Sequence, residues 1–158
     1  MKKLAALARS FRYAGRGIVR SVRAERNLRI HLCAVVFVIL TGAFERLSAA
    51  HWAIELVCCA LVISLELVNT ALENVCDALC PERNAGIGAA KDVCAGAVLA
   101  AALFSAAVWV VILLRGGGNA ARFFAAFSHP ALPCLLALWA FGSALIVFLP
   151  EKSNDTEE

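Results

Sequence analysis

Four long apolar segments, separated by polar ones, dominate the pattern along the chain. They are residues 30–44, 52–72, 91–114 and 131–149. A helix needs about 20 mostly apolar residues to cross a bilayer, and the first segment reaches that length if it extends to about Ala50. We therefore predict an all-α integral membrane protein with three core transmembrane helices and an additional C-terminal transmembrane helix.

Residues 1–29 have a different pattern, in which apolar residues recur at helical spacing with Lys or Arg between them. The apolar positions are Leu4, Leu7, Ala8, Phe11, Ala14, Ile18 and Val22. Nine of the 15 basic residues lie between Lys2 and Arg29. This pattern favours an amphipathic helix in the plane of the lipid headgroups, with a solvated basic helix as the alternative. The same basic residues predict a cytoplasmic amino terminus.

The remaining segments complete the predicted organisation. A polar break lies between Asp77 and Lys91 and contains Pro81, Gly86 and Gly88. The predicted units are a surface helix over 1–29, a three-span core over 30–115, a linker over 116–130, a transmembrane helix over 131–149 and an acidic tail over 150–158. Within the uncharged last helix, we expect Trp139 and Phe141 to face lipid or the outside of an assembly.

The seven cysteines lie mostly inside the apolar segments. We interpret them as reduced, small apolar residues. Cys76 and Cys80 are four residues apart on one helix face, so a disulfide or a metal there is the alternative.

Polar residues form a stripe at the end of the second apolar segment. At about 100° per residue, Glu66, Asn69, Glu73 and Asp77 fall within an arc of roughly 80°. An ionisable residue inside a membrane span is costly and by default marks a functional site. Packing between helices is the competing interpretation, but it would favour Ser, Thr or Asn over three carboxylates.

The predicted topology brings further polar groups to the level of this stripe. They are Glu25 and Asn27 before the first span, and Lys91 and Asp92 at the start of the third. A carboxylate partly within hydrocarbon suits a general base, whereas carboxylates at the wet edge suit Mg²⁺. This arrangement would serve an enzyme that joins a lipid hydroxyl to a water-soluble phosphate donor. The chain has neither a P-loop nor the protein-kinase motifs.

Three segments carry a family resemblance: ERNLRIH at 25–31, ELVNTALENVCD at 66–77 and AKDVCAGAVL at 90–99. They resemble the signature segments of the small prokaryotic diacylglycerol kinases. FRYAGRGI at 11–18, followed by ERNLRIH, is more similar to the Gram-positive branch, which phosphorylates undecaprenol. The resemblance covers roughly residues 9–115, and the fourth span and the PERNAG loop depart from the family pattern.

The resemblance implies an ATP- and Mg²⁺-dependent lipid kinase of the bacterial plasma membrane, a homotrimer whose active sites are shared between neighbouring subunits. Glu66 matches the catalytic base and Asn69 a supporting active-site amide. The expected metal ligands are Glu25 and Glu73. Expected contacts to the nucleotide come from Tyr13, Glu25, Glu73, Asp77, Glu82, Arg83, Asn84, Lys91 and Asp92.

Other functions remain open at this point. A small transporter or assembly subunit could use Glu66 and Glu73 as a proton or cation relay, but this does not explain Lys91 and Asp92. A phospholipid-forming phosphotransferase would need an aspartate-rich motif that is absent. No nucleic-acid partner is expected. The sequence does not choose between undecaprenol and diacylglycerol, because both require only an apolar groove.

Overall fold

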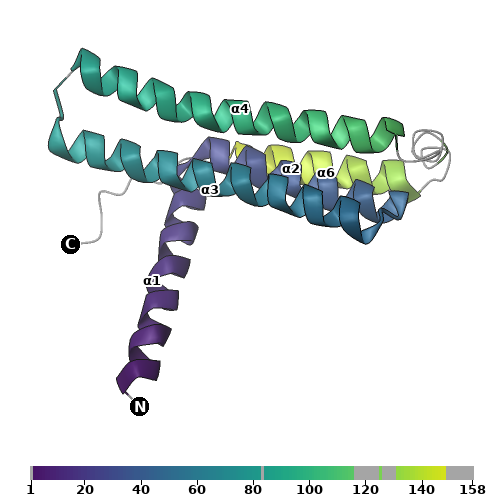
Figure 1. Ribbon diagram of the computed structural model, residues 1–158, viewed down its shortest axis with the longest axis horizontal. Coiled ribbons are helices and arrows are strands. Elements are labelled where there is room, and N and C mark those ends of the chain that lie inside the picture. The colour runs from purple at the N-terminus through teal and green to yellow at the C-terminus, as the bar shows by residue number, and fades with distance from the viewer. Residues whose placement is uncertain (1, 83, 116–124, 126–130, 149–158) are drawn as a thin grey trace.

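The fold is an all-helical bundle with one projecting helix. The structure, a computed structural model, describes residues 2–82, 84–115, 125 and 131–148, and the regular secondary structure of these ranges is entirely helical. Its helices are α1 (Lys2–Ala24), α2 (Arg26–Glu45), α3 (Ala49–Leu79), α4 (Ala85–Arg115) and α6 (Ala131–Val147). The long helices α3 and α4 lie side by side, and α1 leaves the bundle at a steep angle (Figure 1). The all-α prediction is confirmed.

Three of these helices are long and apolar enough to cross a membrane. They are α2, α3 and α4 as far as Leu114, which confirms the three core spans. The fourth predicted span corresponds to α6, which has 17 residues and is shorter than the roughly 20 that a bilayer requires. That span therefore stays a prediction. Residue 149, the linker over 116–130 apart from Ala125, and the tail over 150–158 lie outside the described residues.

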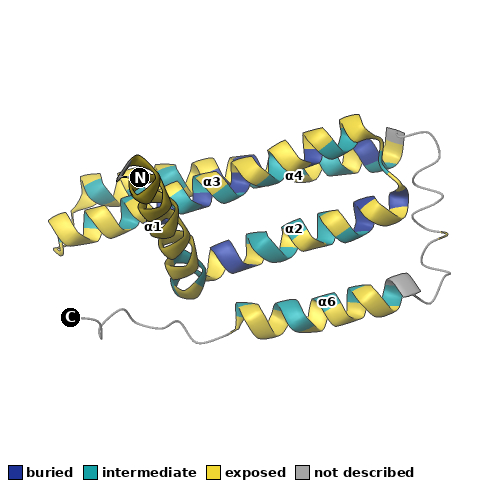
Figure 2. Ribbon diagram, turned by 90° about the horizontal axis from the view of Figure 1, so that it is seen from below, coloured by how far each residue is buried: buried dark blue, intermediate teal, exposed yellow. Residues whose placement is uncertain are grey.

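Buried polar residues outnumber buried apolar ones, and most of the large apolar side chains lie outside. The buried polar residues are Arg29, Thr41, Glu45, Glu55, Glu66, Asn69 and Thr70. Many large apolar residues of α3 and α4 are instead exposed, and Figure 2 shows how much of these two helices is exposed. Such an arrangement suits a bilayer, where lipid solvates the apolar surface and polar groups must find partners within the protein.

The α2–α3 connection is short because both helix ends are capped. Arg46 adopts a left-handed conformation (φ 51°, ψ 50°), and the Leu47 N–H donates to the Gly42 carbonyl at 3.3 Å. The Ser48 Oγ then accepts from the His51 N–H and caps α3. Gly42 also permits close packing, since a β-carbon there would lie 3.0 Å from the Trp52 ring.

Two predicted boundaries are wrong. The basic segment over 1–29 is not one helix, because Glu25 is extended (φ −104°, ψ 116°) and separates α1 from α2. The polar break between Asp77 and Lys91 is also shorter than expected, since both residues lie on helices. Asn84 explains the early start of α4, because its Oδ1 accepts from the Gly86 N–H at 2.9 Å.

Candidate active site

The polar stripe of α3 forms the centre of the candidate site. Glu66 is only 3% exposed, and Asn69 is also buried. The Asn69 amide donates to the Glu73 Oε1 at 2.8 Å, which is possible because the two residues are four apart on one helix. Burial thus decreases along the stripe from Glu66 to the exposed Asp77, so one end is shielded and the other is open.

Two further hydrogen bonds fix the helix around the buried carboxyl group. The Thr70 hydroxyl donates to the Glu66 carbonyl at 3.0 Å. The Asn74 amide donates to the Thr70 carbonyl at 2.8 Å. These two side chains use backbone acceptors of their own helix, so neither of them occupies the carboxyl group of Glu66.

The neighbouring helix α4 brings a cation to the open end of the stripe. Lys91 forms an ion pair with Asp77, and this contact links residues 14 apart in the chain. The Lys91 side chain is 29% exposed, whereas that of Asp77 is 69% exposed. Because the carboxylate is mostly in water, the pair positions the ammonium group more than it stabilises the fold. Asp92 lies beside Lys91 and is exposed.

Glu25 lies half-buried at the junction of α1 and α2, and Arg29 fixes that junction. Arg29 is 4% exposed, and its guanidinium group donates to the Arg23 carbonyl at 3.1 Å and to the Val147 carbonyl at 3.3 Å. These acceptors belong to the last turns of α1 and α6, where helix carbonyls lack partners within the helix. One cation thus joins three helices next to Glu25.

The other predicted nucleotide contacts belong to α1 or to the α3–α4 connection, and not to the stripe itself. Tyr13 is 60% exposed and lies 11 residues, or about 17 Å of helix, before the end of α1. Glu82 is exposed in the α3–α4 turn. The Asn84 side-chain oxygen is used to cap α4, and Arg83 lies outside the described residues.

The packing of α6 contradicts part of the sequence analysis. Trp139 does not face lipid, because its indole N–H donates to the Cys33 carbonyl at 3.0 Å and its ring lies 5.2 Å from that of Phe37. The mistake arose because an uncharged helix gives no indication of which aromatic residue pairs with its neighbour. Phe141 is exposed, as expected.

Neither a protein-only metal cluster nor a disulfide forms in the described part of the chain. No group of three or more His, Cys, Asp or Glu residues there could hold a metal ion. All seven cysteines are free in the structure, which agrees with the interpretation of reduced thiols.

Three buried charged residues had no predicted role in the site: Arg29, Glu45 and Glu55. Glu55 is only 2% exposed and precedes Glu66 by 11 residues, so the two side chains differ by only about 20° around α3. The rule that identified Glu66 applies equally to Glu55, since it is an ionisable residue inside a membrane span. Arg29 belongs to the basic amino-terminal segment and to ERNLRIH, but neither pattern predicts its burial.

Fold and site together define a small integral membrane protein with a carboxylate-rich site at one end of its bundle. Residues 12–113 match the model of the prokaryotic diacylglycerol kinases, and the chain belongs to this family. It is 38% identical over 106 residues to the undecaprenol kinase of Bacillus subtilis strain 168, an alignment that covers 67% of this chain and 86% of that protein. No solved structure matches the chain.

A second relative is the diacylglycerol kinase of Synechocystis sp. strain PCC 6803. It is 40% identical over 106 residues, which cover 66% of this chain and 61% of that protein. The matched region contains the stripe of α3 and ends before α6. Membership of a lipid-kinase family supports the enzymatic interpretation and gives the relay interpretation no support.

Proposed function

We propose that the protein transfers the γ-phosphate of ATP to the hydroxyl group of a membrane lipid alcohol, with undecaprenol as the favoured acceptor and diacylglycerol next. The main observation behind this proposal is that Glu66 is buried and lies on the same face of α3 as Asn69 and Glu73, whose side chains are hydrogen-bonded to each other. The similarity to an undecaprenol kinase over 86% of that relative's length supports the choice of lipid. The product would serve recycling of a lipid carrier or of phospholipid.

Glu66 is the general base in this proposal. The lipid hydroxyl would approach its carboxylate from the bilayer, lose its proton to it and attack the γ-phosphorus as the bond to ADP breaks. Because Glu66 is buried, water is kept from replacing the lipid hydroxyl as the acceptor of the phosphoryl group. Asn69 supports the site by holding Glu73 through the hydrogen bond between their side chains.

The open end of the stripe suits the nucleotide. Glu25 and Glu73 would hold Mg²⁺. When bound, this ion neutralises part of the negative charge of the nucleotide phosphates. The two carboxylates fit this ion because it prefers oxygen ligands and keeps several of its waters, and the Asn69 amide binds only one oxygen of Glu73. Lys91 would contact a phosphate after leaving Asp77. Further contacts would come from Asp77, Asp92, Glu82, Arg83, Asn84 and Tyr13.

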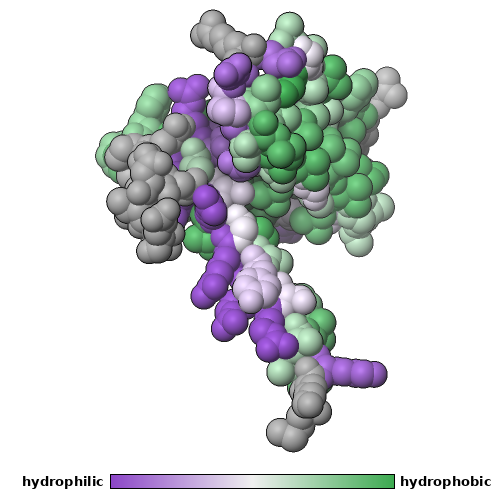
Figure 3. All heavy atoms as spheres, turned by 90° about the vertical axis from the view of Figure 1, so that its left-hand side faces the viewer, coloured by the Kyte–Doolittle hydropathy of each residue, from purple (hydrophilic) through white to green (hydrophobic). Residues whose placement is uncertain are grey.

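A homotrimer with shared sites and a cytoplasmic amino terminus completes the proposal. Hydrophilic residues form a band along α1 and over the adjoining end of the bundle, beside a hydrophobic flank (Figure 3). Leu4, Leu7 and Phe11 are exposed on α1, which suits contact with lipid in the headgroup plane. Since one chain does not bring Tyr13 to the stripe, a neighbouring subunit could supply it.

A side-by-side assay tests this function. Purified protein in phosphatidylcholine nanodiscs would receive labelled ATP, with undecaprenol or dioleoylglycerol at equal mole fraction, in the presence and absence of Mg²⁺. We expect Mg²⁺-dependent phosphorylation that is faster with undecaprenol and is lost in Glu66→Gln. A faster reaction with dioleoylglycerol would reverse the lipid assignment, and phosphorylation of neither lipid would refute the kinase proposal.

A further inference from the structure

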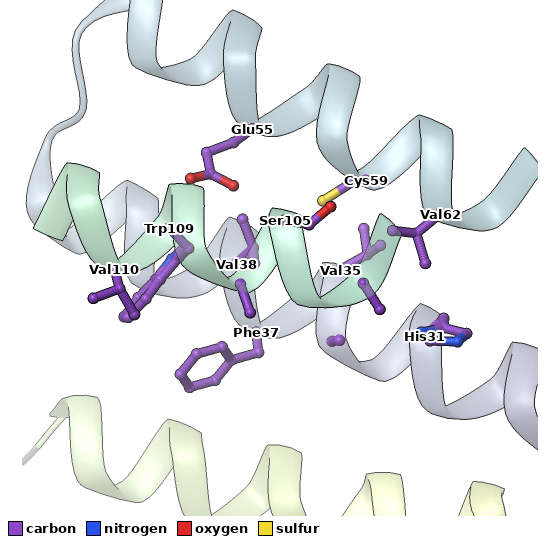
Figure 4. Close-up of a pocket in the computed structure, with 13 residues that line it drawn as sticks. His31, Val35, Phe37, Val38, Glu55, Cys59, Val62, Ser105, Trp109 and Val110 are labelled. Atoms are coloured by element: carbon purple, nitrogen blue, oxygen red, sulfur yellow. The ribbon is translucent and has the colours of Figure 1, made fainter. Parts of the chain in front are cut away.

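An apolar cavity of about 260 Å³ lies between α2, α3 and α4. Its wall consists mainly of Ala, Val, Phe and Trp side chains, and Figure 4 shows them arranged around the space. The residues of this wall that carry polar groups are His31, Glu55, Cys59, Ser105 and Trp109. An apolar space of this kind suits a hydrocarbon chain, and the nature of the polar groups decides what that chain could carry.

Glu55 is the polar group that requires an explanation. Its carboxyl group extends from α3 into the cavity, toward the level of Trp109 (Figure 4). The Glu55 Oε1 is fully buried and has no hydrogen-bond partner in the described part of the chain. Ser105 does not supply one, since its hydroxyl donates to the Ala101 carbonyl at 2.7 Å. A buried polar group without a partner is strongly unfavourable, so a ligand with a hydrogen-bond donor would be stabilised here.

The depth of Glu55 indicates from which side such a ligand would enter. Glu55 lies about 17 Å along α3 from Glu66, on the same face. With the proposed cytoplasmic amino terminus, a hydrocarbon layer about 30 Å thick whose inner edge lies near Leu72 has its outer edge near Trp52. Glu55 would then be about 5 Å inside the outer edge. Val62 lines the same cavity one helical turn from Glu66, so the space extends from the outer carboxyl group toward the proposed catalytic one.

We propose that this cavity is a second lipid-alcohol site, which opens to the outer half of the bilayer. The hydroxyl group of the ligand would bind the Glu55 carboxyl group, and its chain would extend inward between Val38 and Val62. A hydroxyl supplies the missing donor without bringing another charge into the membrane. The choice of an alcohol over other donors rests on the proposed function, because the acceptor of that reaction is itself a lipid alcohol.

Quenching of Trp109 fluorescence by a brominated probe tests this site. The full chain with Trp52→Phe and Trp139→Phe, in nanodiscs, would retain Trp109 as its only tryptophan. The probes are 2-bromoundecan-1-ol, whose bromine lies next to its hydroxyl group and therefore at the level of Trp109, and 2-bromoundecane, compared at equal mole fraction in the membrane. We expect half-maximal quenching at about three- to tenfold less alcohol than bromoalkane, which is the ratio expected for one net hydrogen bond. Equal quenching by both probes would overturn the proposal.

Three variants test where the hydroxyl group and the hydrocarbon chain of the probe bind. Glu55→Leu should abolish the preference for the alcohol, whereas Glu55→Gln, which can still hydrogen-bond, should keep part of it. Ala102→Phe should fill the cavity and reduce quenching by both probes. Normal quenching of Trp109 in the Ala102→Phe variant would overturn the proposal. So would a full preference for the alcohol in both Glu55→Gln and Glu55→Leu. Either result would mean that the probe binds elsewhere, including between copies of the protein.

Competition identifies the natural class of alcohol without measuring catalysis. Undecaprenol and dioleoylglycerol would each be added against the brominated alcohol, and relief of quenching by either supports the site and shows which lipid it prefers. Relief by neither would refute a lipid-alcohol site. Phosphorylation by the same preparation is scored separately, so the kinase proposal and this site can fail independently.

Discussion

At the scale of single residues, the two ends of the α3 stripe differ in exposure although they lie on one helix. Glu66 is buried, whereas Asp77 is mostly in water and pairs with Lys91. Proton abstraction from a lipid and recognition of a charged nucleotide need these two environments. About 17 Å of helix separates the two residues, so the bilayer itself can provide the difference in polarity.

Glu66→Gln should reduce turnover by about 10²–10⁴-fold, because the amide keeps the size of the side chain but cannot accept the hydroxyl proton. The measurement is the initial rate of lipid phosphorylation at saturating ATP and lipid. An unchanged midpoint of thermal unfolding serves as the control for folding. Turnover within threefold of the wild type would remove Glu66 from the role of general base.

Glu73→Ala and Glu25→Ala should each raise the Mg²⁺ concentration for half-maximal activity. The increase should be about tenfold or more, since even partners outside the ligand shell contribute that much to metal affinity. Titration of activity with Mg²⁺ at fixed ATP measures it, with Glu158→Ala in the acidic tail as a matched control. Normal Mg²⁺ dependence in both variants would refute the metal assignment.

At the scale of elements, α6 is attached to the part of the bundle that carries Glu25. Its Trp139 binds the Cys33 carbonyl, and its last carbonyl accepts from Arg29. The proposed catalytic groups nevertheless lie between Glu25 and Asp92, before this helix begins. The contacts therefore affect the stability of the α1–α2 junction more than the chemistry.

Deletion of residues 119–158 should leave an active kinase with a lower midpoint of thermal unfolding in detergent. The loss arises because Arg29 loses one backbone acceptor, and a hydrogen bond to a charged group contributes about 1.5–3 kcal/mol. A chain that ends after residue 150 keeps α6 and is the matched control. A truncated chain that assembles normally but does not phosphorylate lipid would show that α6 helps to form the site.

The same helix allows a test of coupling. Arg29→Gln should destabilise the full chain more than the chain that lacks residues 119–158, because in the latter the Val147 acceptor is already absent. The comparison of four unfolding midpoints gives this difference. Equal effects in both backgrounds would mean that the contact between Arg29 and α6 contributes nothing.

At the scale of the whole molecule, one chain leaves its proposed site incomplete. The described residues hold no group of three or more potential metal ligands, and Tyr13 lies far along the projecting helix α1. A homotrimer could complete the site by bringing the amino-terminal segment of one subunit to the stripe of another.

Mixing of inactive subunits tests this arrangement. Glu66→Gln and Glu25→Ala chains should each be nearly inactive alone but should regain part of the activity when they are co-assembled, because some shared sites then contain both intact residues. The measurement is lipid phosphorylation after co-expression of the two chains with different affinity tags. No recovery in a verified mixed assembly would indicate that each subunit carries a complete site.

The sequence by itself determined the three long apolar helices and the lipid-kinase family. These follow from local properties, namely continuous apolar length and the fixed spacing of polar residues on α3. The ends of the helices were harder to predict from the sequence, because the cap at Asn84 and the extended conformation of Glu25 depend on individual hydrogen bonds and backbone angles.

Only the tertiary structure decided which side chains from distant segments meet. It placed Trp139 against Cys33 and Phe37, joined Arg29 to the ends of α1 and α6, and enclosed Glu55 in a cavity between three helices. Periodicity gives the face on which a residue lies but not the helix that covers that face. The physical reason is that packing depends on the shapes of both partners, and those partners are far apart in the sequence.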